Sequence, residues 1–226
     1  MDKSRIPVAI SWLLLGMFLL GPVVTKQVWA KDSDATKIFD RERLVAWCIV
    51  PFDARKRSPS QRAEMVTEIG MKRVAYDWRA EHVPTFEAEI EQYKKHGIEF
   101  FAFWSWHDSL EPLIAKHGIR PQIWVMLPGV GDKPEAEKVK AAAEAIRPMV
   151  EKTARLGLPL GLYNHGGWGG EPENLAAVCK YLHERHNADH VGIVYNLHHG
   201  HEHIARFPAA FAAIKPYLLC LNLNGM

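Results

Sequence analysis

The feature that most constrains the fold is a unit repeated along the chain: a short apolar run, a polar loop, an amphipathic stretch, and a glycine before the next apolar run. The runs are rich in Val, Ile, Phe, Tyr and Trp, which is typical of strands buried on both faces. They occupy residues 44–50, 73–76, 98–104, 121–127, 158–163, 191–195 and 217–221. The sequence therefore predicts seven strands.

The amphipathic stretches have recognisable helix ends. Ser58, Pro59 and Gln61 form a capping-box pattern with proline at the first helical position. Asp108 and Asp132 are predicted to cap two later helices. Glycine supplies the left-handed residue that ends a helix, and we expect it in this role at Gly70, Gly97, Gly118 and Gly157.

Alternating strands and helices predict parallel strands joined by right-handed crossovers. Either an open doubly wound sheet or a barrel fits this pattern. The loop at residues 51–55 lacks the glycine of a phosphate-binding loop, so we favour an α/β fold of the (β/α) TIM type. Residues 31–226 have the length of one such domain.

The N-terminus resembles a secretory signal. Lys3 and Arg5 precede an apolar stretch at residues 6–24, and Ala30 ends a small-x-Ala pattern. We expect cleavage after residues 1–30, export to the periplasm or beyond the cell, and no stable membrane insertion afterwards. The alternative is an uncleaved anchor, which also places the domain outside the cytoplasm.

Composition narrows the class of partner. Lys plus Arg number 28 against 26 for Asp plus Glu, and the charges are interspersed, so nothing indicates a nucleic-acid partner. A small neutral carbohydrate fits better, and the sequence does not indicate an oligomeric state. Three cysteines make no disulfide framework in a chain of this length. Cys48 and Cys220 are predicted to be buried thiols in strands.

Two loops carry a family resemblance. Residues 163–167 (YNHGG) follow the fifth run, and residues 195–201 (YNLHHGH) follow the sixth. With the strand order, they resemble the xylose-isomerase-like TIM-barrel superfamily of sugar isomerases and epimerases, over essentially all of residues 31–226. The resemblance implies a divalent metal held by carboxylates and imidazoles at the ends of the last four strands, and proton transfer between sugar carbons.

The chain departs from that family pattern. Tyr163 stands where the resemblance implies a metal-binding Glu, Asn196 replaces the Asp three residues before His199, and Asn222 or Asn224 occupies the seventh-strand position. The eighth strand is missing, so we expect either an open barrel or, by preference, an incomplete one.

Neutral amides do not supply the anionic oxygen that hard cations require. A metal such as zinc or manganese would therefore depend on imidazoles, for which His165, His199 and His201 are the candidates. The alternative is a surface histidine loop that binds no specific ion.

Polar residues just beyond several strands are the candidate site. Those assigned to proton transfer are Asp77, His107, His165 and His199. Those assigned to substrate binding are Trp104, Asn164, Trp168, Asn196, His198 and Asn222. The structural alternatives are that Asp77 pairs with Arg79 and that Trp104 is core.

The glycine-rich loop at residues 166–170 would let backbone N–H groups approach a ligand, but Glu171 and Glu173 would repel a phosphate there. The leading hypothesis is thus an exported isomerase or epimerase of an unphosphorylated sugar or polyol. The alternatives are a non-catalytic carbohydrate-binding or degenerate barrel, and a histidine-rich periplasmic metal binder.

Overall fold

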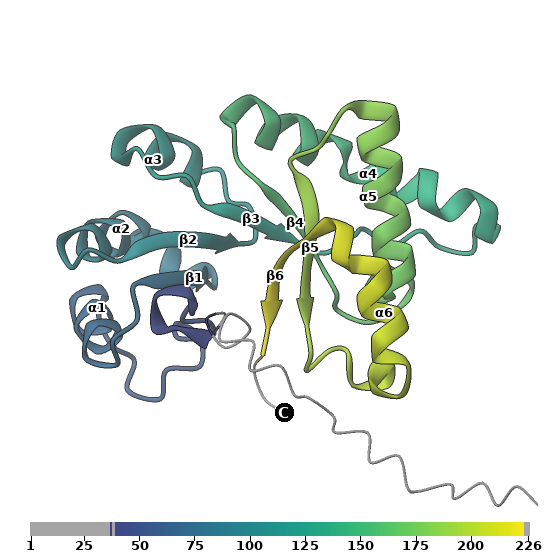
Figure 1. Ribbon diagram of the computed structural model, residues 1–226. Coiled ribbons are helices and arrows are strands. Elements are labelled where there is room, and N and C mark those ends of the chain that lie inside the picture. The colour runs from purple at the N-terminus through teal and green to yellow at the C-terminus, as the bar shows by residue number, and fades with distance from the viewer. Residues whose placement is uncertain (1–36, 38, 224–226) are drawn as a thin grey trace, which may run out of the picture.

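A single curved sheet of six parallel strands forms the centre of the molecule (Figure 1). The computed structural model describes residue 37 and residues 39–223. The strands are β1 (Arg73–Asp77), β2 (Glu99–Trp104), β3 (Gln122–Val125), β4 (Leu160–Tyr163), β5 (Val191–Asn196) and β6 (Leu218–Asn222). Six of the seven predicted strands are therefore confirmed.

Helices line the outer side of this sheet (Figure 1). They are α1 (Pro59–Glu68), α2 (Phe86–Lys95), α3 (Leu110–His117), α4 (Glu135–Leu156), α5 (Pro172–His186) and α6 (Phe207–Ile214). Short 3-10 helices join them: η2 (Arg41–Arg43), η3 (Ala80–Thr85), η4 (Trp168–Gly170), η5 (His201–Arg206) and η6 (Lys215–Tyr217).

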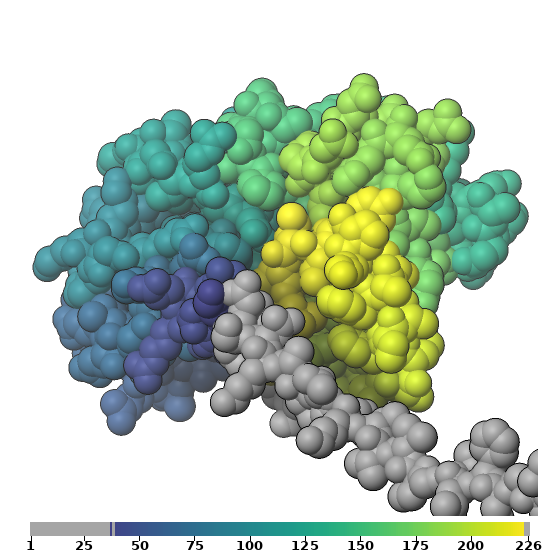
Figure 2. Space-filling model, viewed as in Figure 1, coloured from purple at the N-terminus to yellow at the C-terminus, as the bar shows by residue number. Residues whose placement is uncertain are grey.

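The strand order distinguishes the two architectures that the sequence allowed. The strands lie in chain order from β1 to β6, with every neighbouring pair parallel. A doubly wound sheet would reverse its order at a switch point and carry helices on both faces. The fold is thus TIM-barrel-like but incomplete, a half-barrel. In Figure 2 the purple N-terminal part and the yellow C-terminal part lie near one another, beside the two edges of the curved sheet, β1 and β6.

The prediction of a first strand at residues 44–50 was wrong. Only Ala46 joins the sheet, through an isolated parallel bridge to Val74. Two residues later the backbone of Cys48 turns left-handed, with φ at 58°. A residue in that conformation cannot continue a strand, so the described part of the sheet has six strands rather than seven.

The two faces of the sheet bury different side chains. A large apolar core lies between the strands and the helices, and a smaller cluster on the concave face contains Ala75, Ala102, Trp124, Tyr163 and Val194. A Cβ on Gly161 would stand 2.6 Å from Val194 and 2.9 Å from Trp124. This glycine lets the Trp124 ring lie against β4.

The helix-end predictions gave mixed results. Ser58 forms both halves of the predicted capping box, and all four predicted glycines adopt positive φ. The two aspartate caps were wrong, because α3 and α4 begin after Ser109 and Pro134 without a side-chain cap. Asp108 instead accepts a hydrogen bond from Trp106 Nε1 at 2.9 Å.

The thiol predictions also need correction. Cys48 and Cys220 are only half-buried, and Cys48 lies outside any strand; the fully buried thiol is Cys179, in α5. The expected signal at residues 1–30 lies outside the described residues. Among the helices of the described part, none has both the length and the apolar character to cross a bilayer.

Candidate active site at the ends of the strands

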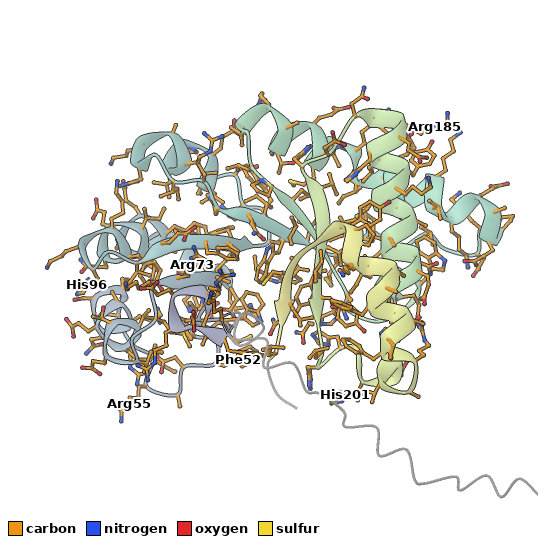
Figure 3. The ribbon with its side chains drawn as sticks, in the orientation of Figure 1. Phe52, Arg55, Arg73, His96, Arg185 and His201 are labelled. Atoms are coloured by element: carbon orange, nitrogen blue, oxygen red, sulfur yellow. The ribbon has the colours of Figure 1, made fainter. Side chains whose placement is uncertain are left out.

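A cleft of about 310 Å³ opens where the concave face meets the carboxyl ends of the strands. This is the end at which TIM-type barrels collect functional loops. Its lining comes from the last residues of β1, β2, β4 and β5, from the loops that follow three of them, and from the segment that follows Ala46. The lining residues are Trp47, Cys48, Phe52, Asp77, Arg79, Trp104, Tyr163, His165, Asn196, His198 and His199. In Figure 3, Phe52 and His201 lie at the end to which the β5 and β6 arrows point, whereas Arg185 lies at the other end.

Asp77 is the buried carboxyl group of this cleft. It ends β1 and is only 2% exposed. Burial raises the pKa of Asp77 to about 7, since the Arg79 guanidinium, the Val50 N–H and the Cys48 thiol only partly stabilise the charged form. Neither carboxyl oxygen has a hydrogen bond of ordinary geometry. The sequence analysis allowed an ion pair between Asp77 and Arg79 as an alternative role for this carboxyl group. The ion pairs of the described residues do not include that pair.

Cys48 lies beside this carboxyl group in a strained backbone conformation. Burial, and then the neighbouring Asp77 charge, raise the pKa of the Cys48 thiol to about 12. A thiol with such a pKa stays protonated at neutral pH and is a poor nucleophile. Cys48 is therefore a weak donor to Asp77, and its positive φ is the kind of strain that gathers at functional sites.

Imidazoles gather on the side of the cleft formed by β4 and β5. The ring centres of His165 and His199 are 4.3 Å apart, those of His198 and His199 are 5.2 Å apart, and His201 follows 5.5 Å from His198. Burial, followed by the proximity of His165 and His198, lowers the pKa of His199. His199 is consequently a neutral imidazole at pH 7, able to accept a proton.

Side-chain contacts of His203 and Arg206 hold the segment that follows these histidines against Tyr195 and Glu171. The Tyr195 hydroxyl lies 2.6 Å from Nδ1 of His203, and Nε2 of His203 lies 3.4 Å from Glu171. Glu171 also pairs with Arg206 at 2.6 Å. Gly200 packs so closely on the Tyr195 ring that a Cβ there would overlap the hydroxyl.

Three predicted site residues form a hydrogen-bonded set with Tyr163 at the ends of β4 and β5: Asn164, Asn196 and His198. Asn164 is fully buried and exchanges hydrogen bonds with the Asn196 backbone, at 2.6 and 3.0 Å. The Asn196 amide donates to the Tyr163 hydroxyl and accepts the His198 N–H at 2.8 Å. Asn164 thus holds the strands together, while Asn196 orients Tyr163 and the histidine loop.

Indole and phenol rings form the remaining wall. The Trp104 ring centre lies 4.6 Å from that of Tyr163 and 6.1 Å from that of Trp47. Burial raises the pKa of Tyr163 to about 12, so its hydroxyl stays protonated. Sequence reasoning missed Trp47, because this residue was assigned to the interior of a strand and no motif marks it.

Other predicted site residues lie away from this cleft. His107 packs against Trp78 and Phe86, with ring centres 5.2 and 5.7 Å away. Asn222 ends β6 and accepts the Leu197 N–H through its backbone oxygen. Trp168 borders a neighbouring cleft.

The predicted imidazole metal site does not assemble as three ligands. Within the described residues, the only group whose ligand atoms lie within one ion's reach of one another is Glu87, Glu91 and His117. This group lies on α2 and α3, and Glu87 there already contacts Lys116 at 2.6 Å and His117 at 2.8 Å. A metal role for His165, His199 and His201 stays a prediction.

Comparison with known proteins supports the fold. No family model matches the chain, and no curated protein is significantly similar in sequence. A 3-keto-D-glucoside 4-epimerase from E. coli superimposes with a TM-score of 0.57 at 14% identity, covering 78% of this chain and 76% of the other.

Two further structures give similar superpositions. A probable 3-DHS dehydratase from Bacillus anthracis gives a TM-score of 0.55 at 16% identity, covering 78% of this chain and 71% of the other. A D-psicose 3-epimerase from Clostridium cellulolyticum H10 gives 0.54 at 12% identity, with the same coverage of 78% and 71%. The chain is thus similar in fold to these two epimerases and to this dehydratase, at 12–16% identity.

Proposed function

We propose that this protein is an isomerase or epimerase of an unphosphorylated sugar or polyol, with Asp77 as its proton-transfer group. The observation that carries the proposal is a buried carboxyl group with a pKa of about 7, set in a cleft walled by indole rings and imidazoles. A general base is most effective when its pKa lies near the working pH. The similarity in fold to sugar epimerases supports the same reading.

The chemistry follows from these groups. The Asp77 carboxylate removes the proton from the carbon next to the sugar carbonyl, and the C–H electron pair moves to the carbonyl oxygen to give an enediolate. In epimerisation Asp77 keeps this proton, and a donor on the other side of the cleft protonates the opposite face of the same carbon. In isomerisation Asp77 gives the proton to the neighbouring carbon, while the hydroxyl proton moves from one enediolate oxygen to the other. Atoms and electrons balance without any co-reactant.

His199 is the partner group on the other side of the cleft. Asp77 ends β1, whereas His199 follows β5, so the two approach a bound sugar from different parts of the half-barrel. The two groups alternate in epimerisation. When the Asp77 carboxylate is the base, the His199 imidazolium gives a proton to the opposite face, and in the reverse reaction the neutral His199 imidazole is the base and protonated Asp77 is the acid. The indoles of Trp47 and Trp104 offer flat apolar surfaces against which the C–H face of a sugar ring packs.

The described cleft does not by itself provide a complete metal site. His165 and His199 bring two imidazoles together, and no third His, Cys, Asp or Glu of the described residues completes a group with them. The proposed proton transfer therefore uses only the side chains of the chain. Zinc and manganese belong in the assay as variables.

Deuterium exchange provides the test. The full chain is incubated in D₂O with a panel of aldoses and ketoses, with and without zinc or manganese, and deuterium at the carbon next to the carbonyl is measured by NMR. We expect exchange with at least one sugar. Absence of exchange with every sugar, under every metal condition, would contradict the proposal.

A matched pair of variants assigns the base. We expect Asp77→Asn to lower the exchange rate by about 10²–10⁴-fold, the usual contribution of a general base. Asp108→Asn makes the same chemical change on an exposed carboxyl outside the cleft and should leave the rate unchanged. Equal rates for both variants would remove Asp77 from the mechanism.

One observation favours a second function, carbohydrate binding without turnover. Tyr163 and Asn196 are neutral and hydrogen-bonded to one another, so the positions that the resemblance assigns to metal-binding carboxylates carry no charge. Calorimetry distinguishes the two functions. Sugar binding that is insensitive to chelator, together with no deuterium exchange, would establish the binding protein.

A further inference from the structure

A second cleft, of about 350 Å³, adjoins the first. Tyr163 and His165 line both clefts, so they form the partition between them. The walls of the second cleft are the loop after β3, residues 126–131, and the loop after β4, residues 165–169, with Lys138 of α4 beside them. A ligand that lies over Tyr163 in the first cleft therefore touches a residue that also lines the second.

Glycines make up five of the thirteen residues that line this second cleft. A Cβ placed on Gly129, Gly131, Gly166 or Gly167 would meet no atom within 4 Å, so all four glycines border open space. Without side chains at these positions, peptide groups are accessible to a ligand. Trp168 adds a half-buried aromatic ring, which suits the apolar face of a sugar.

The charges in this cleft are balanced. Lys138 forms an ion pair with Glu135 at 2.7 Å, and Glu135 also accepts the indole N–H of Trp168. A lysine compensated in this way provides little attraction for a phosphate. Hydrogen-bonding peptide groups, an aromatic ring and balanced charge together suit a neutral polyhydroxylated group.

We infer that the substrate is a disaccharide or glycoside, whose reacting sugar lies in the Asp77 cleft and whose second sugar unit lies in the cleft between residues 126–131 and 165–169. The two clefts together measure about 660 Å³, the sum of 310 and 350 Å³, within the range of about 300–1,000 Å³ usual for ligand sites. This inference rests on the proposed carbohydrate function and makes it more specific.

Calorimetry with matched sugars tests the inference. D-Fructose is compared with three of its glucosyl derivatives, turanose, maltulose and isomaltulose, which carry the second ring at different oxygens. We expect at least one disaccharide to bind about tenfold more tightly than fructose, a factor that corresponds to about 1.4 kcal/mol.

Two cleft variants should abolish this preference. Gly129 has an ordinary φ and open space around its Cβ position, so Gly129→Tyr fills the second cleft without straining the backbone. Trp168→Ala removes the aromatic ring. We expect both variants to bind fructose like the wild type and to lose the tighter binding of the disaccharide.

Trp106→Ala is the matched control for Trp168→Ala. Trp106 is also a half-buried indole that donates to a carboxylate, here Asp108, but it lies outside both clefts. This variant should retain the preference for the disaccharide.

The outcomes separate the inference from the function on which it rests. Fructose binding with no disaccharide preference, or a preference that survives both cleft variants, overturns the inference alone. No binding of any of the four sugars, combined with no deuterium exchange, overturns the proposed function and the inference with it.

Discussion

At the scale of single residues, the burial of Asp77 that suits proton transfer also makes the stability of the fold depend on pH. Its pKa rises from 3.8 to about 7 on folding, so between these pH values the folded chain holds a proton that the unfolded chain has lost. The unfolding free energy therefore falls as pH rises through this window and stays low above it. The loss is on the order of 4 kcal/mol.

Asp77→Asn removes this ionisation. We expect the variant and the wild type to differ little in stability at pH 4, and the variant to become the more stable one by a few kcal/mol at pH 8. Urea unfolding at several pH values measures the gap. Asp108→Asn, on an exposed carboxyl, should show no comparable growth with pH; a gap for Asp77→Asn that stays constant would show that this carboxyl is not buried as described.

The sequence identified much of the site at this scale but not the roles of its members. Asp77, Trp104, His165, His198 and His199 were all chosen because they follow predicted strands, and all line the cleft. Asn164 and His107 were chosen by the same rule. They lie elsewhere because the direction of a loop side chain depends on tertiary packing, which position along a strand does not encode.

At the scale of elements, the packing of Gly200 against Tyr195 should determine how rigid the histidine loop is. Gly200→Ala places a methyl group against the buried Tyr195 hydroxyl and disturbs its contact with His203. We expect a loss of about 1–3 kcal/mol in unfolding free energy, as for other overpacked sites. NMR signals of the His199 ring should shift.

Gly129→Ala is the control for this substitution. Open space surrounds its Cβ position, so we expect unchanged or slightly higher stability, by up to about 1 kcal/mol. Similar losses in both variants, measured by urea unfolding, would show that the Tyr195 contact is not the cause.

Elements were predictable where a local rule determines them. The capping box at Ser58 and the four terminal glycines depend on neighbours within a few residues, and both were confirmed. The first strand was not, because its apolar composition is that of a strand while the left-handed Cys48 ends the pairing. Nothing in the residue types near position 48 signals that conformation.

At the scale of the whole molecule, the half-barrel leaves an apolar stripe on its last strand. Leu219, Leu221 and Leu223 alternate along and beyond β6 with exposures of 36%, 37% and 48%. Among the described strands, β6 pairs only with β5. Exposed apolar edge strands promote self-association.

We expect Leu221→Lys combined with Leu223→Lys to reduce concentration-dependent self-association in analytical ultracentrifugation. Ile69→Lys, on an isolated apolar residue that is 46% exposed at the end of α1, serves as the control. An equal reduction by Ile69→Lys would point to a general effect of charge rather than to this strand.

The overall architecture was predictable in kind, since the repeated strand, helix and glycine unit leaves few alternatives to consecutive parallel strands. The repeat cannot specify how far the curved sheet closes towards a complete barrel, because closure depends on whether terminal segments pair with the sheet. The single bridge at Ala46 is the point at which that pairing stops in the described chain.

The tryptophans at the open concave face should make the intrinsic fluorescence of the protein sensitive to ligand binding. Trp47 and Trp104 line the cleft, and the ring centre of Trp124 lies 5.0 Å from that of Trp47. A molecule that enters the half-barrel must change the surroundings of these rings, so the intrinsic emission of the unlabelled chain should record its arrival. Titrants that attach only to the helical exterior would leave that emission nearly constant.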